Sequence, residues 1–153
     1  MLNIIKPSEI ESIVGKKIGT SDWISIDQDR INMFANATMD HQFIHVNQAE
    51  AEPLFGATIA HGFLCLSLIE GILFQQKIGL VIKGSEMKLN YGLDKVRFLS
   101  PVSVNSEVRI VMKCLDITEK KPGQFLVKNS VTMEIKGIEK PAFAAETLSM
   151  FIT

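Results

Sequence analysis

The sequence contains little cysteine. Its 153 residues include two, Cys65 and Cys114, which is too few for the disulfide framework of a small secreted domain. The two are also far apart, so the CxxC spacing of a zinc or redox site is missing. Because an unpaired cysteine behaves as a small apolar side chain, we expect both to lie in the core.

Clusters of basic residues are missing as well. The net charge is -1 and the sequence pI is about 6.3, with lysine and arginine scattered along the chain. A nucleic-acid-binding protein normally carries a concentrated basic patch. We therefore do not expect nucleic acid as a partner.

No segment has the length and composition of a membrane span or a secretory signal. The apolar start, Met1 to Ile5, is short and is broken by Pro7. The longest apolar stretch is interrupted by Glu70 and falls short of the roughly 20 residues that a bilayer needs. We expect a cytoplasmic protein that does not contact a membrane.

One apolar helix and four alternating segments predict the fold. Residues 59–74 are apolar nearly all round, with Glu70 as the single acid, which is typical of a buried helix. Alternation of apolar and polar residues then predicts strands at residues 86–98, 104–117, 124–136 and 142–152. Turns are expected at Lys121-Pro122-Gly123 and Lys136-Gly137. The composition, 46% hydrophobic, suits one domain over residues 1–153. We predict an α+β fold in which a long antiparallel sheet wraps around a central apolar helix.

Shorter elements are expected before the central helix. Proline and glycine bound a short helix at residues 7–14, and residues 20–26 have strand character. Asp27 and Asn47 are good caps for helices at 28–37 and 48–54. The polar segment 38–45 interrupts this pattern, and we expect it to be irregular.

The histidines are concentrated in this region. His41, His45 and His61 are the three histidines of the chain, and Asp40 lies beside the first of them. A carboxylate can orient a water molecule while an imidazole, with a pKa of about 6.5, transfers a proton near neutral pH. Asp40 and His45 are therefore candidates for acid-base catalysis, although a single histidine is more often a cap or a satisfied core residue.

Two other kinds of chemistry are less well supported. His41 and His45 have the i, i+4 spacing of a zinc-binding helix, but Gln42 stands where a metallohydrolase has its glutamate. Cys65 and Ser67 lie on the apolar helix with no basic residue close by in sequence, so neither is expected to act as a nucleophile. We expect no metal.

Gly62 lies near the expected start of the central helix, and its backbone N–H would be free if the helix opened at this residue. The first backbone N–H groups of a helix have no acceptor within it, and the helix dipole favours an anion there. Gly62 is thus a candidate oxyanion donor. Close packing at the start of the helix is the alternative explanation for a glycine.

The segment from Phe34-Ala35-Asn36-Ala37-Thr38 through Asp40 and His45 to Ala60-His61-Gly62 resembles the MaoC-like dehydratases. The family signature is an aspartate followed by a histidine, and then an Ala-His-Gly that enters the central helix. Asn90 to Phe98, followed by Pro101-Val102, resembles a later strand and turn of the family. The nodulation-protein-N-like branch is the most similar, because Met39 and Gln42-Phe43 depart from the commoner motif.

This resemblance implies a hot-dog fold, a homodimer and the (R)-specific hydration of trans-2-enoyl thioesters, or the reverse dehydration, without a bound cofactor. The implied catalytic residues are Asp40, His45 and Gly62, and the implied substrate-binding residues are Gln42, His61 and Ser67. The substrate would be an acyl-CoA or acyl-carrier thioester. Its phosphates would meet some of Lys83, Lys88, Lys95 and Arg97.

Two other functions remain open on the sequence. A hot-dog thioesterase would direct water at the carbonyl carbon instead of the double bond. A non-catalytic acyl-thioester binding subunit would keep the groove and would tolerate the loss of Asp40.

Overall fold

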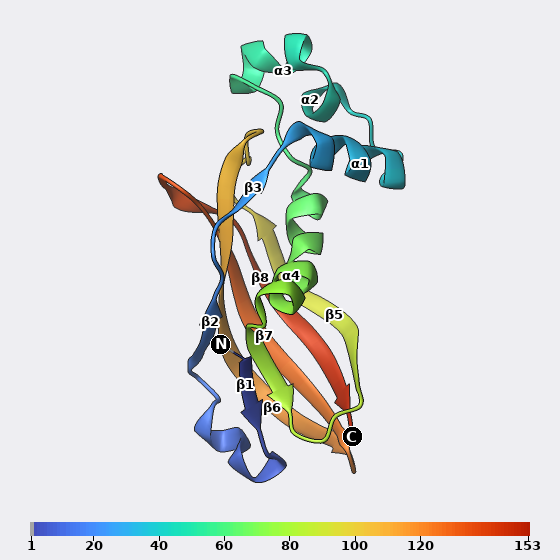
Figure 1. The fold of residues 1–153 in the computed structure, drawn as a ribbon, viewed down its shortest axis with the longest axis vertical. Coiled ribbons are helices and arrows are strands. Elements are labelled where there is room, and N and C mark those ends of the chain that lie inside the picture. Colours follow the sequence, from blue (N-terminus) through green and yellow to red (C-terminus); the bar gives the residue numbers. More distant parts are fainter. Residues whose placement is uncertain (1) are drawn as a thin grey trace.

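One antiparallel sheet forms the body of the protein in the computed structural model, which describes residues 2–153 (Figure 1). Its strands are β2 (Lys17–Thr20), β3 (Ile24–Ile26), β5 (Met87–Phe98), β6 (Ser106–Lys121), β7 (Gln124–Ile135) and β8 (Ile138–Ile152). The order is β2-β6-β7-β8-β5, and β3 also pairs with β6. The four predicted long strands are confirmed. Gly123 and Gly137, at the two predicted turns, have φ of 75° and 80°, which glycine adopts at little cost.

The helix α4 (Gly62–Gln76) lies across one face of this sheet (Figure 1). It contributes Leu64, Cys65, Ile69, Ile72 and Leu73 to the core. The helix begins three residues later than residues 59–74 predict, because the preceding segment is held extended. Ile59 bridges to Ser103, and the Ala60 N–H donates to the Val102 carbonyl at 2.7 Å.

The expectation that α4 is buried all round is wrong for one side. Phe63 is 66% exposed and Phe74 is 86% exposed. Together with Ser67 and Gly71 they form a continuous exposed stripe along α4. The sheet covers the helix from one side, so a helix that is apolar all round leaves this stripe uncovered in the single chain.

Three helices gather at one end of the sheet, near the start of α4 (Figure 1). They are α1 (Gln28–Thr38), α2 (Phe43–Val46) and α3 (Gln48–Phe55). The predicted caps are confirmed: Asp27 and Asn47 accept hydrogen bonds from backbone N–H groups in the first turns of α1 and α3. The segment 38–45 is not wholly irregular, because α2 begins inside it.

The first part of the chain departs most from expectation. The short helix predicted at residues 7–14 is a 3-10 helix, η1 (Pro7–Ser12). The predicted strand at 20–26 is two strands, because the chain bends at Ser21, whose hydroxyl accepts the Ile110 N–H at 2.9 Å in place of a backbone carbonyl. A parallel pair, β1 (Leu2–Ile5) with β4 (Gly79–Ile82), was not predicted.

Both cysteines are free and buried, as expected. Among residues 2–153, no helix is both long enough and apolar enough to cross a membrane.

Candidate active site

A cavity of about 400 Å³ opens at the start of α4. It is lined by Asp40, His45, Ile59, Ala60, His61, Gly62, Phe63, Cys65, Phe98, Leu99, Ser100, Pro101, Val102 and Ala142. Four segments that are distant in sequence therefore meet here. Two of the three histidines and the neighbouring aspartate are among the lining residues.

The His45 side chain is buried and its orientation is fixed. Its Nδ1 lies 2.7 Å from the Ile59 carbonyl oxygen. A carbonyl oxygen only accepts hydrogen bonds, so Nδ1 carries the proton in the neutral ring and Nε2 keeps a free lone pair. The backbone carbonyl of His45 is held in turn by the Gln28 side-chain amide at 2.8 Å. His45 is thus prepared to accept a proton at Nε2.

His61 contacts both the backbone of Asp40 and the ring of His45. Its Nε2 donates to the backbone carbonyl of Asp40 at 2.9 Å, which ties the Asp40 segment to the start of α4. The rings of His61 and His45 stack with centroids 3.8 Å apart and planes inclined by 25°. The Nδ1 of His61 is buried without a hydrogen-bond partner among the described residues. His61 therefore acts on the site mainly by positioning Asp40 and His45.

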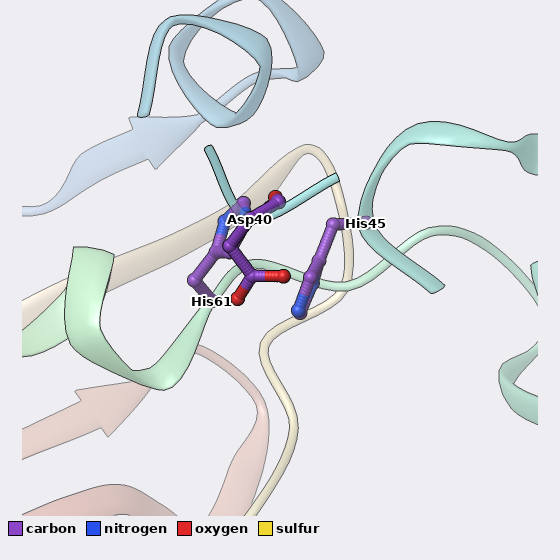
Figure 2. A group of neighbouring side chains, drawn as sticks. All are labelled: Asp40, His45 and His61. Atoms are coloured by element: carbon purple, nitrogen blue, oxygen red, sulfur yellow. The ribbon is translucent and has the colours of Figure 1, made fainter. Parts of the chain in front are cut away.

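The Asp40 carboxylate completes the group. Figure 2 shows it directed toward the ring of His45, with His61 beside it. One coordinating atom from each of Asp40, His45 and His61 lies within 4.8 Å of the others. A water molecule placed between a carboxylate oxygen and an imidazole nitrogen needs about 2.7–3.0 Å to each, and this spacing leaves room for one.

Burial lowers the pKa of His45 below its ordinary value of 6.5. The positive charge that His61 carries when protonated lowers it further, whereas the hydrogen bond to Ile59 and the charge of Asp40 act in the opposite direction. The net shift is downward. His45 is consequently neutral at pH 7, the form in which it accepts a proton.

The pH dependence follows from this shift. Activity that needs neutral His45 should be level above pH 6.5 and should decline only below it. Stability should also decline as pH falls below 6.5, because the unfolded chain then binds the proton before the folded chain does. A kcat/KM profile recorded with melting temperatures at each pH measures both effects. An acid limb centred above 6.5 would contradict the assignment of His45 as the base.

Gly62 is the first residue of α4, so its N–H has no acceptor within the helix. It lines the same cavity as Asp40 and His45. A Cβ at this position would lie 2.9 Å from Cδ1 of Phe98. The glycine therefore satisfies both explanations given above: it exposes a backbone donor, and it lets an aromatic ring lie directly against the helix.

His41 and two of the predicted substrate-binding residues, Gln42 and Ser67, lie outside this group. The His41 side chain is exposed, and neither it nor the Gln42 side chain lines the cavity. The Gln42 backbone N–H does donate to Asp40 Oδ1 at 3.3 Å. Ser67 lines a neighbouring cavity, where its hydroxyl donates to the Phe63 carbonyl at 2.7 Å.

Cys65 lines the cavity, but burial raises the pKa of its thiol to about 12. The thiol is therefore protonated at neutral pH and is a poor nucleophile.

Sequence reasoning missed two residues of the site, Gln28 and Phe98. The Gln28 amide holds the His45 carbonyl and accepts the Thr58 hydroxyl at 2.5 Å. Phe98 packs against Gly62 and lies 5.5 Å from Phe63, measured between ring centroids. A glutamine at the start of a helix, or a phenylalanine at the end of a strand, gives no sign in the sequence that it contacts the site.

Asp40, His45 and His61 also form a geometrically possible metal site. Two imidazoles and a carboxylate suit zinc or non-haem iron. This group differs from the possible zinc site considered on the sequence, which paired His41 with His45. The hydrogen bonds of both imidazoles to backbone carbonyls would leave one nitrogen of each ring for a metal.

Another cavity is larger than the one at the histidines. A space of about 530 Å³ lies toward the other end of α4, next to Leu73 and Phe74. We place the chemistry at the smaller cavity, because it contains the paired carboxylate and imidazole and the free helix N–H.

Comparison with known proteins shows the family to which the chain belongs. Residues 9–135 match the family model described as MaoC like domain. Nodulation protein N of Rhizobium meliloti is 43% identical over 149 residues, covering 95% of this chain and 91% of that protein. The 3-hydroxyacyl-thioester dehydratase Z of Mycobacterium tuberculosis is 40% identical over 147 residues, covering 95% of each. The solved (R)-hydratase from A. caviae superposes with a TM-score of 0.71 at 26% identity, covering 89% of this chain and 94% of that one. The chain therefore belongs to the MaoC-like dehydratase family, a family of hydro-lyases, and has the hot-dog fold.

Proposed function

We propose that this protein adds water to trans-2-enoyl thioesters to give (R)-3-hydroxyacyl thioesters, or catalyses the reverse dehydration. The observation that carries the proposal is the shared cavity of Asp40, the free Nε2 of His45 and the N–H of Gly62. The relatives named as a hydratase and a hydroxyacyl-thioester dehydratase support it.

In the hydration direction, Asp40 and His45 hold one water molecule between them. As the water oxygen bonds to C3, His45 Nε2 takes its proton, and the carboxylate of Asp40 stabilises the imidazolium that forms. The electron pair of the double bond moves toward the carbonyl, which gives an enolate oxygen.

The enolate oxygen would accept a hydrogen bond from the Gly62 N–H, with the dipole of α4 favouring its charge. Collapse of the enolate returns the electron pair to C2, which takes the proton from His45 Nε2. The products are a hydroxyl at C3 and a hydrogen at C2, and the enzyme returns to its starting state.

The deciding experiment is an assay with a series of thioesters from crotonyl-CoA to octenoyl-CoA. Hydration removes the absorbance of the conjugated enoyl group, so turnover can be followed directly. Release of free thiol with the double bond intact would show a thioesterase instead. Tight binding without any turnover would show a non-catalytic binding subunit.

The position of the thioester gives a structural test. In a complex with substrate or product, the carbonyl oxygen should lie about 2.7–3.1 Å from the Gly62 nitrogen, with C3 beside Asp40 and His45. An acyl group that enters from the far end of α4 and leaves Gly62 without a contact would reduce Gly62 to a packing residue.

We also propose that the protein forms a homodimer through β5. This strand is an edge of the sheet, and its apolar side chains are exposed, including Leu89 at 47% and Tyr91 at 63%. The exposed stripe of α4 lies beside it, since both line one cavity. A long apolar edge strand is normally paired or covered, and a second β5 would cover it.

Substitution of Leu89 by lysine should therefore disrupt the dimer, because it places a charge in the proposed strand pair. Sedimentation should show a dimer for the native protein and a monomer for Leu89→Lys. Leu54→Lys, the same change at a 64% exposed leucine of α3, should remain dimeric. A fully active monomer of the native chain would contradict the proposal.

Among the four basic residues considered for the phosphates, Arg97 is the best placed. Lys88 is paired with Glu70 at 2.7 Å and Lys95 with Glu146 at 2.8 Å. Neither Lys83 nor Arg97 has a carboxylate partner within residues 2–153. Of these two, Arg97 directly precedes Phe98 of the cavity. We propose that it meets a phosphate of the substrate.

The mechanism requires no metal, so treatment with a chelator should leave turnover unchanged. The Gly62 N–H provides the stabilisation that a Lewis acid would otherwise supply. The check is to assay the protein after dialysis against a strong chelator, with metal analysis before and after. Activity that is lost and then restored by added zinc would assign Asp40, His45 and His61 to a metal instead.

A further inference from the structure

The buried face of the sheet carries a group of polar residues away from the active site. Asn129, Thr147 and Ser149 line the cavity of about 530 Å³ at the far end of α4, and we call them the distal polar group. Asn129 and Thr147 are direct partners across β7 and β8. Their neighbours on the same face are apolar, for example Val127 and Val131 on β7.

One side chain of the distal polar group, Asn129, is not satisfied by contacts within the described residues. Asn129 is 6% exposed, and its Oδ1 is buried with no hydrogen-bond partner among the described residues. Thr147 and Ser149 are 8% and 2% exposed. A buried polar atom without a partner destabilises a fold, and such atoms in native proteins usually serve a ligand or a water.

Three neighbouring cavities follow one another along α4 from the active site to this cavity, and we call their row the track. The active-site cavity and the neighbouring cavity share Phe63. The neighbouring cavity and the distal one share Glu70 and Thr147. The lining residues thus follow one side of α4 from Gly62 to Phe74. With a rise of 1.5 Å per residue, the track from Gly62 to Leu73 is roughly 16 Å long.

We propose that the distal polar group recognises a neutral hydrogen-bonding substituent, a hydroxyl in particular, near the far end of the acyl chain. The inference rests on the proposed function, and it specifies the substrate class: a medium-length acyl thioester hydroxylated at its distal end. The chain would run from Gly62 along the track, and its hydroxyl would donate to Asn129 Oδ1. A hydroxyl both donates and accepts, which matches an amide beside two hydroxyls.

The charges near the cavity favour a neutral group. Lys88 and Glu70 also line it, but they are bonded to each other at 2.7 Å across the gap between β5 and α4. The lysine is therefore already neutralised, and the glutamate would repel a carboxylate. Lys77 also lines the cavity, but it is an exposed residue, whereas the distal polar group is buried. A carboxylate held by the buried group would lose its water next to the negative charge of Glu70, which is costly.

The test compares ω-hydroxy-trans-2-decenoyl-CoA with trans-2-decenoyl-CoA. In the native protein the hydroxylated substrate should have the higher kcat/KM, by about tenfold, since one buried hydrogen bond is at stake. Asn129→Leu should remove or reverse this preference. Ser130→Ala, the next residue of β7 on the opposite face, should retain it. Melting temperatures of both variants check that they fold.

Binding of the two corresponding saturated acyl-CoA thioesters, measured by calorimetry, separates this inference from the proposed function. A binding preference for the hydroxylated thioester that is lost in Asn129→Leu supports the distal polar group even where no enoyl thioester is turned over. Equal kcat/KM and equal binding of the two chains by the native protein would overturn the inference. A preference that persists in Asn129→Leu, or that is lost in Ser130→Ala, would overturn it equally.

Discussion

Replacement of Asp40 by asparagine or of His45 by glutamine should lower kcat by about 10²- to 10⁴-fold, the usual contribution of a general acid-base group. Asp40→Asn keeps the size of the side chain but removes the charge that stabilises an imidazolium. His45→Gln can still donate to the Ile59 carbonyl, which His45 Nδ1 contacts at 2.7 Å, but it provides no proton acceptor. Because the two residues act on one water, the double variant should be little worse than the poorer single one.

His41→Ala is the matched control for these variants. His41 is one residue from Asp40 in sequence, but its side chain is exposed and does not line the cavity. Its turnover should be close to that of the native protein. Circular dichroism and melting temperature should be similar for all variants at neutral pH. Near-native turnover in either Asp40→Asn or His45→Gln would refute the proposed pair.

Gly62→Ala should also lower activity strongly, by about 10²-fold, through displacement of Phe98. The added methyl would lie 2.9 Å from the Phe98 ring, closer than a carbon contact allows. The aromatic ring therefore lies directly in the path of the methyl. The ring is 46% exposed, so it can move, but only by rearranging the wall of the cavity.

A double-variant cycle distinguishes displacement of Phe98 from obstruction of the thioester by the methyl at position 62. Phe98→Ala makes room for the methyl, and alanine keeps the backbone N–H, so Gly62→Ala with Phe98→Ala should be as active as Phe98→Ala alone. The measurement is kcat/KM for the four proteins of the cycle. Equal losses from Gly62→Ala with and without Phe98 would mean that the methyl blocks the thioester itself.

The long strands and the central helix are predictable because their signals are local. Alternation in residues 124–136 determines which side chains of β7 face the core, whatever the neighbouring strands are. The caps Asp27 and Asn47 act on their own first turns. Asp40, His45 and Gly62 could be proposed from the sequence because a short motif carries them, and the three line one cavity.

Contacts between distant segments were not predictable in this way. The pairing of β1 with β4, the bend at Ser21 and the packing of Phe98 on Gly62 each join residues far apart in sequence. The start of α4 was misplaced for the same reason, since the Val102 carbonyl holds Ala60 extended. The local sequence around Ala60 gives no sign of a hydrogen bond from a segment about 40 residues away.

The sequence by itself determined the class of fold, the long strands and the residues of the motif, because each depends on spacing within one segment. Only the tertiary structure decided how those residues work. It fixes the tautomer of His45 through the Ile59 carbonyl, stacks His61 on that ring and leaves one side of α4 exposed. It also brings Asn129 and Thr147 together under the helix. Proton position, burial and cavity shape arise from atoms that meet only when the chain has folded, and no spacing along the chain encodes them.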